Sequence, residues 1–241
     1  MSAGKTSFDL GNIHVDVVKK DIKNIHLSVY PPHGSVRVAA PSRMKTDLIR
    51  VFTIQKLDWI KKQQQKLLEQ DREAPREYLN KESHYLWGKR YLMEVIEVDE
   101  APHVELTHQK ILLHVRKGAS EAKKQQVLDE WYRELLKEAI PPLIKKWESK
   151  IGKEVERFYI QRMKTKWGSC THQKQSIRIN LELIKKPPMC LEYIVVHEMI
   201  HLIEPTHNAN FMALMKHHMP QWNTHRDTLN RLPVRHEEWR Y

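Results

Sequence analysis

Cysteine is scarce in this sequence, which has only Cys170 and Cys190 among its 241 residues. The N-terminus also lacks the positively charged stretch and following apolar segment of an export signal. So few cysteines without an export signal are typical of free thiols in a reducing compartment, and they argue against a disulfide-stapled secreted domain. We therefore expect a cytoplasmic protein in which both thiols are free.

Long apolar runs and low-complexity tracts are also missing. The longest apolar runs, such as residues 194–196, fall far short of the ~20 residues that cross a bilayer, so we expect no membrane partner. With 40% apolar and 29% charged residues, the composition is that of a folded globular protein. A chain of 241 residues can bury a core without disulfides or metal. A bound metal is therefore expected to serve chemistry rather than folding.

Acidic residues are outnumbered, since 41 Lys and Arg face 30 Asp and Glu and give a net charge of +11. Such an excess attracts polyanions over a Debye length, which makes nucleic acid a candidate partner. No nucleic-acid-binding motif accompanies the charge. A basic surface without a nucleic-acid partner stays the alternative interpretation.

The N-terminal half predicts a β-rich lobe with one long helix. Short alternating segments separated by turn residues predict strands over residues 13–18, 25–29, 36–38, 78–79, 85–98 and 111–115, with a turn at 87–89. From Thr46 the pattern has helical period through Trp59 and Ile60 and then becomes polar. Gly118 ends this pattern, so we place a first domain at residues 1–118 and a second at 119–241.

The second domain begins with helical signals. Ser120 is a plausible N-cap for a helix that Pro141 and Pro142 are expected to end, and a further helix over 143–150 is expected to close at Gly152. Residues 176–181 predict a strand with Ile177 and Ile179 on one face and Arg178 and Asn180 on the other. From Met189 to about Ile203 the apolar residues recur at helical spacing without glycine or proline.

This last helix carries the pattern H-E-x-x-H at His197, Glu198 and His201. Residues i and i+4 lie on one helix face, so two imidazoles can converge on one ion. Glu198 lies about 100° around the helix, where it can reach a water that the ion activates and act as general base. The spacing therefore predicts a metal site with its base.

Catalytic zinc usually takes three protein ligands, so a third is needed. Pro205 disfavours helical geometry before it, which lets the chain turn and return His207 to the ion. His207 follows His201 by six residues, as in the longer H-E-x-x-H-x-x-G-x-x-H pattern, although Glu204 stands at the glycine. Glu204 is the alternative ligand if the helix runs one more turn. Asn208 is a good N-cap for a short helix with Phe211 that would support His207.

The C-terminal third resembles a known family over an ordered series of blocks. These are residues 162–170 (RMKTKWGSC), 179–181 (INL), 193–202 (YIVVHEMIHL), His207, Phe211 and 220–222 (PQW). The blocks resemble the YgjP-like predicted metal-dependent hydrolases, which are related to SprT-like proteases and more distantly to other zincins. Residues 36–41 and the helix with Trp59 are similar too. Met199-Ile200 and Met212 depart from the residues common there.

The resemblance implies zinc ligands at His197, His201 and His207 and a catalytic base at Glu198. It also implies an α+β fold: a β-rich N-terminal lobe followed by a zincin-like metallopeptidase domain whose active-site helix packs on a small sheet. The block Trp167-Gly168-Ser169-Cys170 has two interpretations. Its glycine permits close packing against the helix, with Cys170 buried and not ligating, or its strand edge binds extended substrate.

We therefore expect a zinc-dependent peptidase that acts on peptides or proteins. Its candidate substrate-binding residues are Trp167, Gly168, Ser169 and Asn180. Arg178 shares the face of Asn180, and a solvated face explains both residues as well. Two alternatives remain: a DNA-associated SprT-like protease, and a non-catalytic metal-binding module.

Overall fold

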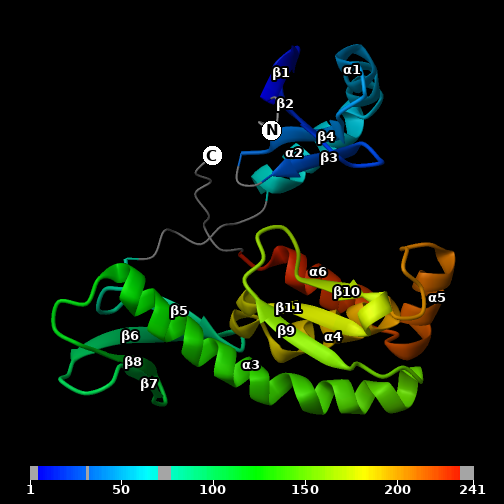
Figure 1. The fold of residues 1–241 in the computed structure, drawn as a ribbon. Coiled ribbons are helices and arrows are strands. Elements are labelled where there is room, and N and C mark those ends of the chain that lie inside the picture. The colour runs from blue at the N-terminus through cyan, green and yellow to red at the C-terminus, as the bar shows by residue number, and fades with distance from the viewer. Residues whose placement is uncertain (1–4, 31–32, 70–76, 234–241) are drawn as a thin grey trace. The chain divides into compact units, whose positions relative to one another are not determined.

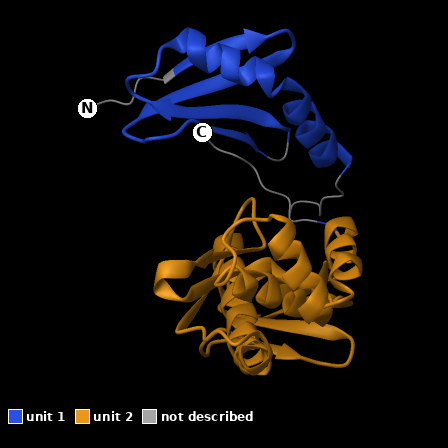
Figure 2. Cartoon of the chain, turned by 90° about the vertical axis from the view of Figure 1, so that its right-hand side faces the viewer, with its two compact units in different colours: residues 1–74, 233–241 blue, residues 75–232 orange. Residues whose placement is uncertain are grey.

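A computed structural model describes residues 5–30, 33–69 and 77–233 of the chain. The chain forms two compact units, residues 1–74 with 233–241 and residues 75–232 (Figure 2). The expected domain boundary at residue 118 differs from this division, because the strands before it pack on the helix after it and share one core. Mixed α+β structure is confirmed in both units.

The first unit is a four-stranded sheet with two helices. Its strands are β1 (Lys5–Leu10), β2 (Ile13–Lys20), β3 (His26–Tyr30) and β4 (Ser35–Pro41), in the order β1-β2-β4-β3 with only β2 and β4 parallel. Alternate residues of β2 and β4 form a core with Ile49 and Ile60. The expected single helix is instead α1 (Thr46–Gln55) and α2 (Leu57–Glu69), which separate at Lys56. No glycine or proline marks this break in the sequence.

The second unit begins with another four-stranded sheet. Its strands are β5 (Ser83–Leu86), β6 (Lys89–Glu97), β7 (His103–Leu106) and β8 (Lys110–Val115), in the order β5-β6-β8-β7. Strands β6 and β8 are parallel, and the other two pairs are antiparallel. The strands expected near residues 85–98 and 111–115 are confirmed, whereas β1 and β7 were not expected.

The long helix α3 (Glu121–Ile151) links the two sheets of this unit (Figure 1). Ser120 caps it by accepting a hydrogen bond from Lys123 N–H, and Gly152 ends it in the left-handed conformation, as predicted. Pro141 and Pro142 lie inside the helix, so the prediction of two helices was wrong. Buried residues recur every three or four positions on both sides of the prolines, and their packing offsets the local cost of proline. They are Leu128, Tyr132, Leu136, Ile140, Ile144, Trp147 and Ile151.

At the other end of α3 lies a three-stranded sheet that holds the helix with the histidine motif. Its strands are β9 (Arg157–Gln161), β10 (Gly168–Thr171) and β11 (Ser176–Asn180), in the order β10-β11-β9. Helix α4 (Pro188–Ile200) contacts β10, β11 and α3. Helices α5 (Ala209–His218) and α6 (Trp222–Arg231) pack on α4. None of the described helices is both long and apolar enough to span a bilayer.

Candidate metal centre

Helix α4 is the central element of the candidate site. Pro188 occupies its first turn, where the missing N–H costs nothing, and nine of its residues are buried. A helix that is apolar on most sides must lie inside the fold, where its few polar side chains are held by their surroundings. Its last turn and the segment that follows carry the two motif histidines and the turn at Pro205.

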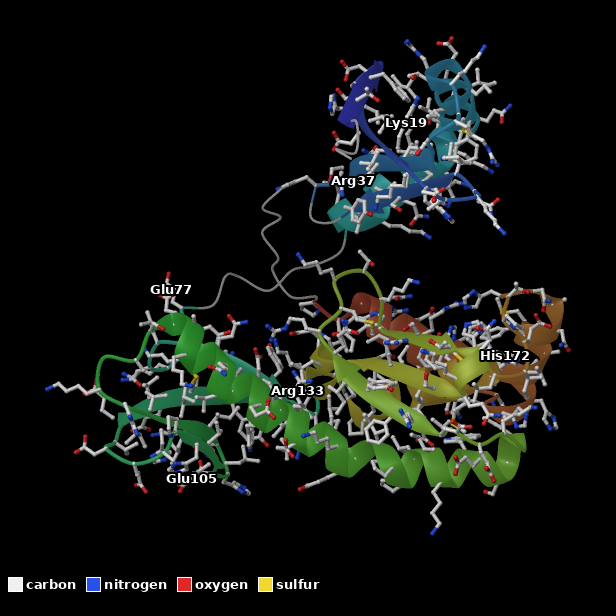
Figure 3. The ribbon with its side chains drawn as sticks, in the orientation of Figure 1. Lys19, Arg37, Glu77, Glu105, Arg133 and His172 are labelled. Carbon is white, nitrogen blue, oxygen red and sulfur yellow. The ribbon has the colours of Figure 1, made fainter. Side chains whose placement is uncertain are left out.

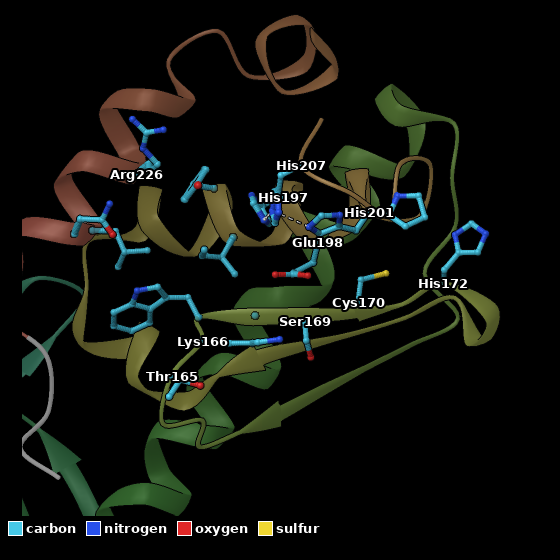
Figure 4. A pocket seen from close by; sticks show the side chains of 17 residues that line it. Thr165, Lys166, Ser169, Cys170, His172, His197, Glu198, His201, His207 and Arg226 are labelled. Carbon is cyan, nitrogen blue, oxygen red and sulfur yellow. Dashed lines mark hydrogen bonds between the residues drawn. The ribbon is translucent and has the colours of Figure 1, made fainter. Parts of the chain in front are cut away.

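Three imidazoles meet at the C-terminal end of α4 (Figure 4). Nε2 of His207 lies 3.0 Å from Nε2 of His197 and 3.1 Å from Nε2 of His201. Three nitrogens bound to one tetrahedral ion at ~2.0–2.1 Å lie roughly 3.3 Å apart, so the spacing fits a single small metal ion. The structure thus brings together the three histidines that the sequence predicts.

Phe211 packs beneath this cluster. Its ring centroid lies 4.9, 4.6 and 4.7 Å from those of His197, His201 and His207, and its side chain is buried. Asn208 caps α5 by accepting a hydrogen bond from Phe211 N–H at 3.0 Å, as the sequence predicts. The cap fixes the start of α5, and α5 in turn positions the Phe211 ring against the three imidazoles.

The turn at Glu204 orients the second histidine. Nδ1 of His201 lies 2.9 Å from the carbonyl oxygen of Glu204, which can only accept, so this nitrogen carries the proton and Nε2 keeps its lone pair. The Glu204 carboxylate accepts hydrogen bonds from Asn210 and Thr206, and those bonds lower its pKa. Glu204 therefore shapes the turn and lies outside the cluster of three ligands.

The imidazoles of His197 and His201 are held in their neutral form. Burial, followed by the charges of the other two histidines, lowers the pKa of His197 to about 3. Burial also lowers the pKa of His201. Neutral imidazole is the form that binds metal, so the site offers lone pairs near neutral pH.

Glu198 lies between α4 and the edge strand β10 (Figure 4). Burial raises its pKa to about 8, and the nearby Lys166 ammonium opposes this rise. A Cβ atom on Gly168 would lie 2.5 Å from Oε1 and 2.8 Å from Cγ of Glu198. Glycine is therefore required at position 168 for this carboxylate to keep its place, which agrees with the close-packing interpretation of the sequence block.

A cleft of about 530 Å³ opens beside the histidines and Glu198. Trp167, Gly168 and Ser169 line it, as three of the four predicted substrate-binding residues. Cys170 lines it too; its thiol is free and half-buried, and burial raises its pKa to about 11. The close-packing interpretation expects Cys170 to be buried and not ligating; the thiol is only partly buried, and it lies outside the three-ligand cluster.

Asn180 has a different position. It is buried, donates to the carbonyl oxygens of Met163 and Lys166 at 2.8 and 2.7 Å, and accepts from the N–H groups of Met163 and Glu182. It therefore holds the loop before β10 and does not line the cleft. Arg178 donates to Thr171 and lies over the Tyr159 ring.

Six polar residues of the cleft were not predicted: Thr165, Lys166, His172, Tyr193, Arg226 and Asn230. Tyr193 stands four residues before His197, so helical spacing could have identified it. Its ring lies edge-on to His197 at 5.8 Å, and burial raises its pKa to about 12. Arg226 comes from α6, and no local pattern links it to the motif.

The comparisons with known proteins agree with this geometry. No curated protein gives a significant match to the chain. The family model described as YgjP-like, metallopeptidase domain, matches residues 23–232, which is most of both units. A metallopeptidase requires a metal ion, and the three histidines provide a donor set for one. The chain therefore belongs to the YgjP-like metallopeptidase domain family.

Proposed function

We propose that the protein is a zinc-dependent peptidase in which His197, His201 and His207 hold the ion and Glu198 is the general base. The main support for this proposal is the convergence of three Nε2 atoms beside the buried carboxylate of Glu198, which lines the same cleft. Nε2 of His207 lies 3.0 Å from that of His197 and 3.1 Å from that of His201. Three imidazoles with one open position are a ligand set of catalytic zinc.

The chemistry divides between the ion and the chain. When bound, zinc would supply Lewis acidity to a water molecule and a substrate carbonyl, and its charge would favour the carboxylate form of Glu198. Glu198 takes the proton from that water and returns it to the leaving amine. Its burial against Gly168 holds the carboxylate in one position, so this proton transfer needs little rearrangement.

The cleft offers a surface for an extended peptide. Strand β10 lies at the edge of its sheet and pairs only with β11 among the strands of the described ranges. A free strand edge can bind peptide backbone by adding a strand, while cleft residues contact its side chains. We assign this role to Gly168 and Ser169 at the start of β10 and to Trp167 just before it, all of which line the cleft.

The test separates metal binding from proton transfer. Glu198→Gln should retain the zinc of the wild type and lose peptide turnover by about 10²–10⁴-fold. His201→Ala should lose one equivalent of zinc together with turnover. His217→Ala, which removes an exposed histidine of α5, is the matched control and should change neither. Unchanged turnover in zinc-loaded Glu198→Gln would contradict the assigned role.

The DNA-associated peptidase and the non-catalytic metal module remain alternative functions. The first rests on the net charge of +11, and DNA-stimulated cleavage in a salt titration would support it. The second predicts stoichiometric zinc without turnover of any peptide in a proteome-derived library. The first result would add DNA as a partner of the peptidase, and the second would contradict the peptidase function.

A further inference from the structure

A second group of potential ligands lies far from α4 in the fold, on the hairpin of β7 and β8. His103 and His114 are directly opposite each other in the antiparallel register. Glu105, two residues after His103, points to the same face because side chains alternate along a strand. The other face of the hairpin is apolar, with Ile111, Leu113 and Val115 in the core. The three side chains therefore gather on the outer face, and Figure 3 labels Glu105 there.

Each of the three side chains offers one ligand atom that lies within 4.8 Å of those of the other two. The two imidazole rings stack with centroids 4.2 Å apart and planes 6° from parallel. Oε1 of Glu105 lies 3.6 Å from Nε2 of His103, and Oε2 lies 3.7 Å from Nε2 of His114. These separations are too long for hydrogen bonds. They are close to the roughly 3.3–3.5 Å between ligand atoms that share one tetrahedral ion at ~2.0–2.2 Å.

The orientation of His103 leaves a lone pair for an ion. Its Nδ1 lies 3.0 Å from the carbonyl oxygen of Ala101, which can only accept a hydrogen bond. Nδ1 therefore carries a proton, and in the neutral ring the lone pair of Nε2 faces Glu105. A backbone carbonyl on the distal nitrogen is the usual support of a histidine ligand.

His114 gives an independent observation. Its side chain is only 13% exposed, and neither ring nitrogen has a hydrogen-bond partner within residues 5–30, 33–69 and 77–233. A buried polar atom without a partner is destabilising, so such atoms usually have a ligand, an ion or water. A cation beside Nε2 would satisfy this nitrogen, and Glu105 would balance the charge.

We infer that His103, Glu105 and His114 form a second divalent-metal site, which takes zinc or a similar transition ion and ties the edge strand β7 to β8. Two imidazoles and a carboxylate are a donor set of zinc, whereas calcium and magnesium prefer oxygen ligands alone. Strand β7 has only four residues and one strand partner among those described, so an ion that bridges it to β8 would stabilise the sheet edge. This site does not depend on the proposed peptidase function.

The experiment uses the full chain with His197→Ala and His201→Ala, which disables the first cluster, as the parent protein. Equilibrium dialysis against Zn²⁺ should find one equivalent bound. Adding Glu105→Gln or His103→Ala, both at partly exposed positions that tolerate change, should weaken binding by on the order of tenfold or more. His108→Ala, an exposed histidine of the same hairpin, is the matched control and should bind like the parent.

Hydrogen exchange gives a second measurement on the same proteins. Zinc should slow exchange of the amides of residues 103–115 in the parent and in the His108→Ala control, but not in His103→Ala. A parent that binds no zinc at micromolar concentration would overturn the inference. So would equal zinc affinity in the parent and Glu105→Gln, because the three side chains would then be ordinary polar groups of a sheet surface. Neither outcome bears on the first cluster, which the parent lacks.

Discussion

The two ligand clusters of the second unit differ in what surrounds them. The cluster on α4 has a buried carboxylate beside it and opens into a cleft next to a strand edge. The cluster on β7 and β8 lies on the outer face of a hairpin, and its only carboxylate, Glu105, belongs to the ligand set. Both clusters have a donor set that a metal ion could use. Chemistry also requires a base that is not itself a ligand and space for substrate.

The largest expected effect comes from the third ligand of the α4 cluster. His207→Ala should lower zinc affinity well over 100-fold, because even partners outside the ligand set are worth about 10–100-fold, and turnover should fall with the zinc. Glu204→Gln is the control, since its carboxylate bonds Thr206 and Asn210 and not the imidazoles. Zinc dialysis of both variants checks this. Loss of zinc in Glu204→Gln with retention in His207→Ala would make Glu204 the ligand.

The next effect tests whether the base is held in place by close packing. Gly168→Ala introduces a Cβ atom into space that Glu198 occupies, so the carboxylate must move. A displacement of about 1 Å can cost on the order of 100-fold in turnover, and zinc content should not change because the histidines are untouched. Turnover equal to that of the wild type at full zinc occupancy would show that the position of Glu198 is not critical.

A smaller effect is expected from the loop that forms one side of the cleft. Asn180→Ala removes the four hydrogen bonds that hold residues 163–166 and Glu182, so the free energy of unfolding should fall by about 2 kcal/mol. Urea unfolding measures this loss. Asn223→Ala, at an exposed position, is the control and should change the free energy of unfolding by about zero. If Asn180 contacted substrate instead, KM would rise while stability stayed the same.

The smallest effect is expected from the hairpin cluster. His103→Ala in the otherwise native chain should leave peptide turnover within about twofold, because sites without shared partners act independently. Steady-state kinetics at saturating zinc checks this. A large fall in turnover would show that the hairpin cluster also contributes to catalysis, contrary to the account.

Sequence reasoning found the features that depend on local spacing. Helical periodicity placed His197 and His201 on one face, and Pro205 and Asn208 predicted the turn and cap that return His207. Features that depend on tertiary packing were missed. The helix α3 continues through Pro141 because buried residues pack both before and after the prolines. The side chain of Asn180 bonds to the loop at Met163, which the alternation of the strand does not reveal. The pairing of His103 with His114 depends on strand register, which neither residue indicates by itself.

The most direct test of the account is the position of zinc in crystals of Glu198→Gln, located by anomalous scattering at the zinc absorption edge. The account predicts a full-occupancy peak about 2.0–2.1 Å from Nε2 of His197, His201 and His207, with the substituted side chain at position 198 outside the ligand set. A zinc-loaded, inactive protein with no peak at these three histidines, or with Glu204 as the third ligand, would contradict it.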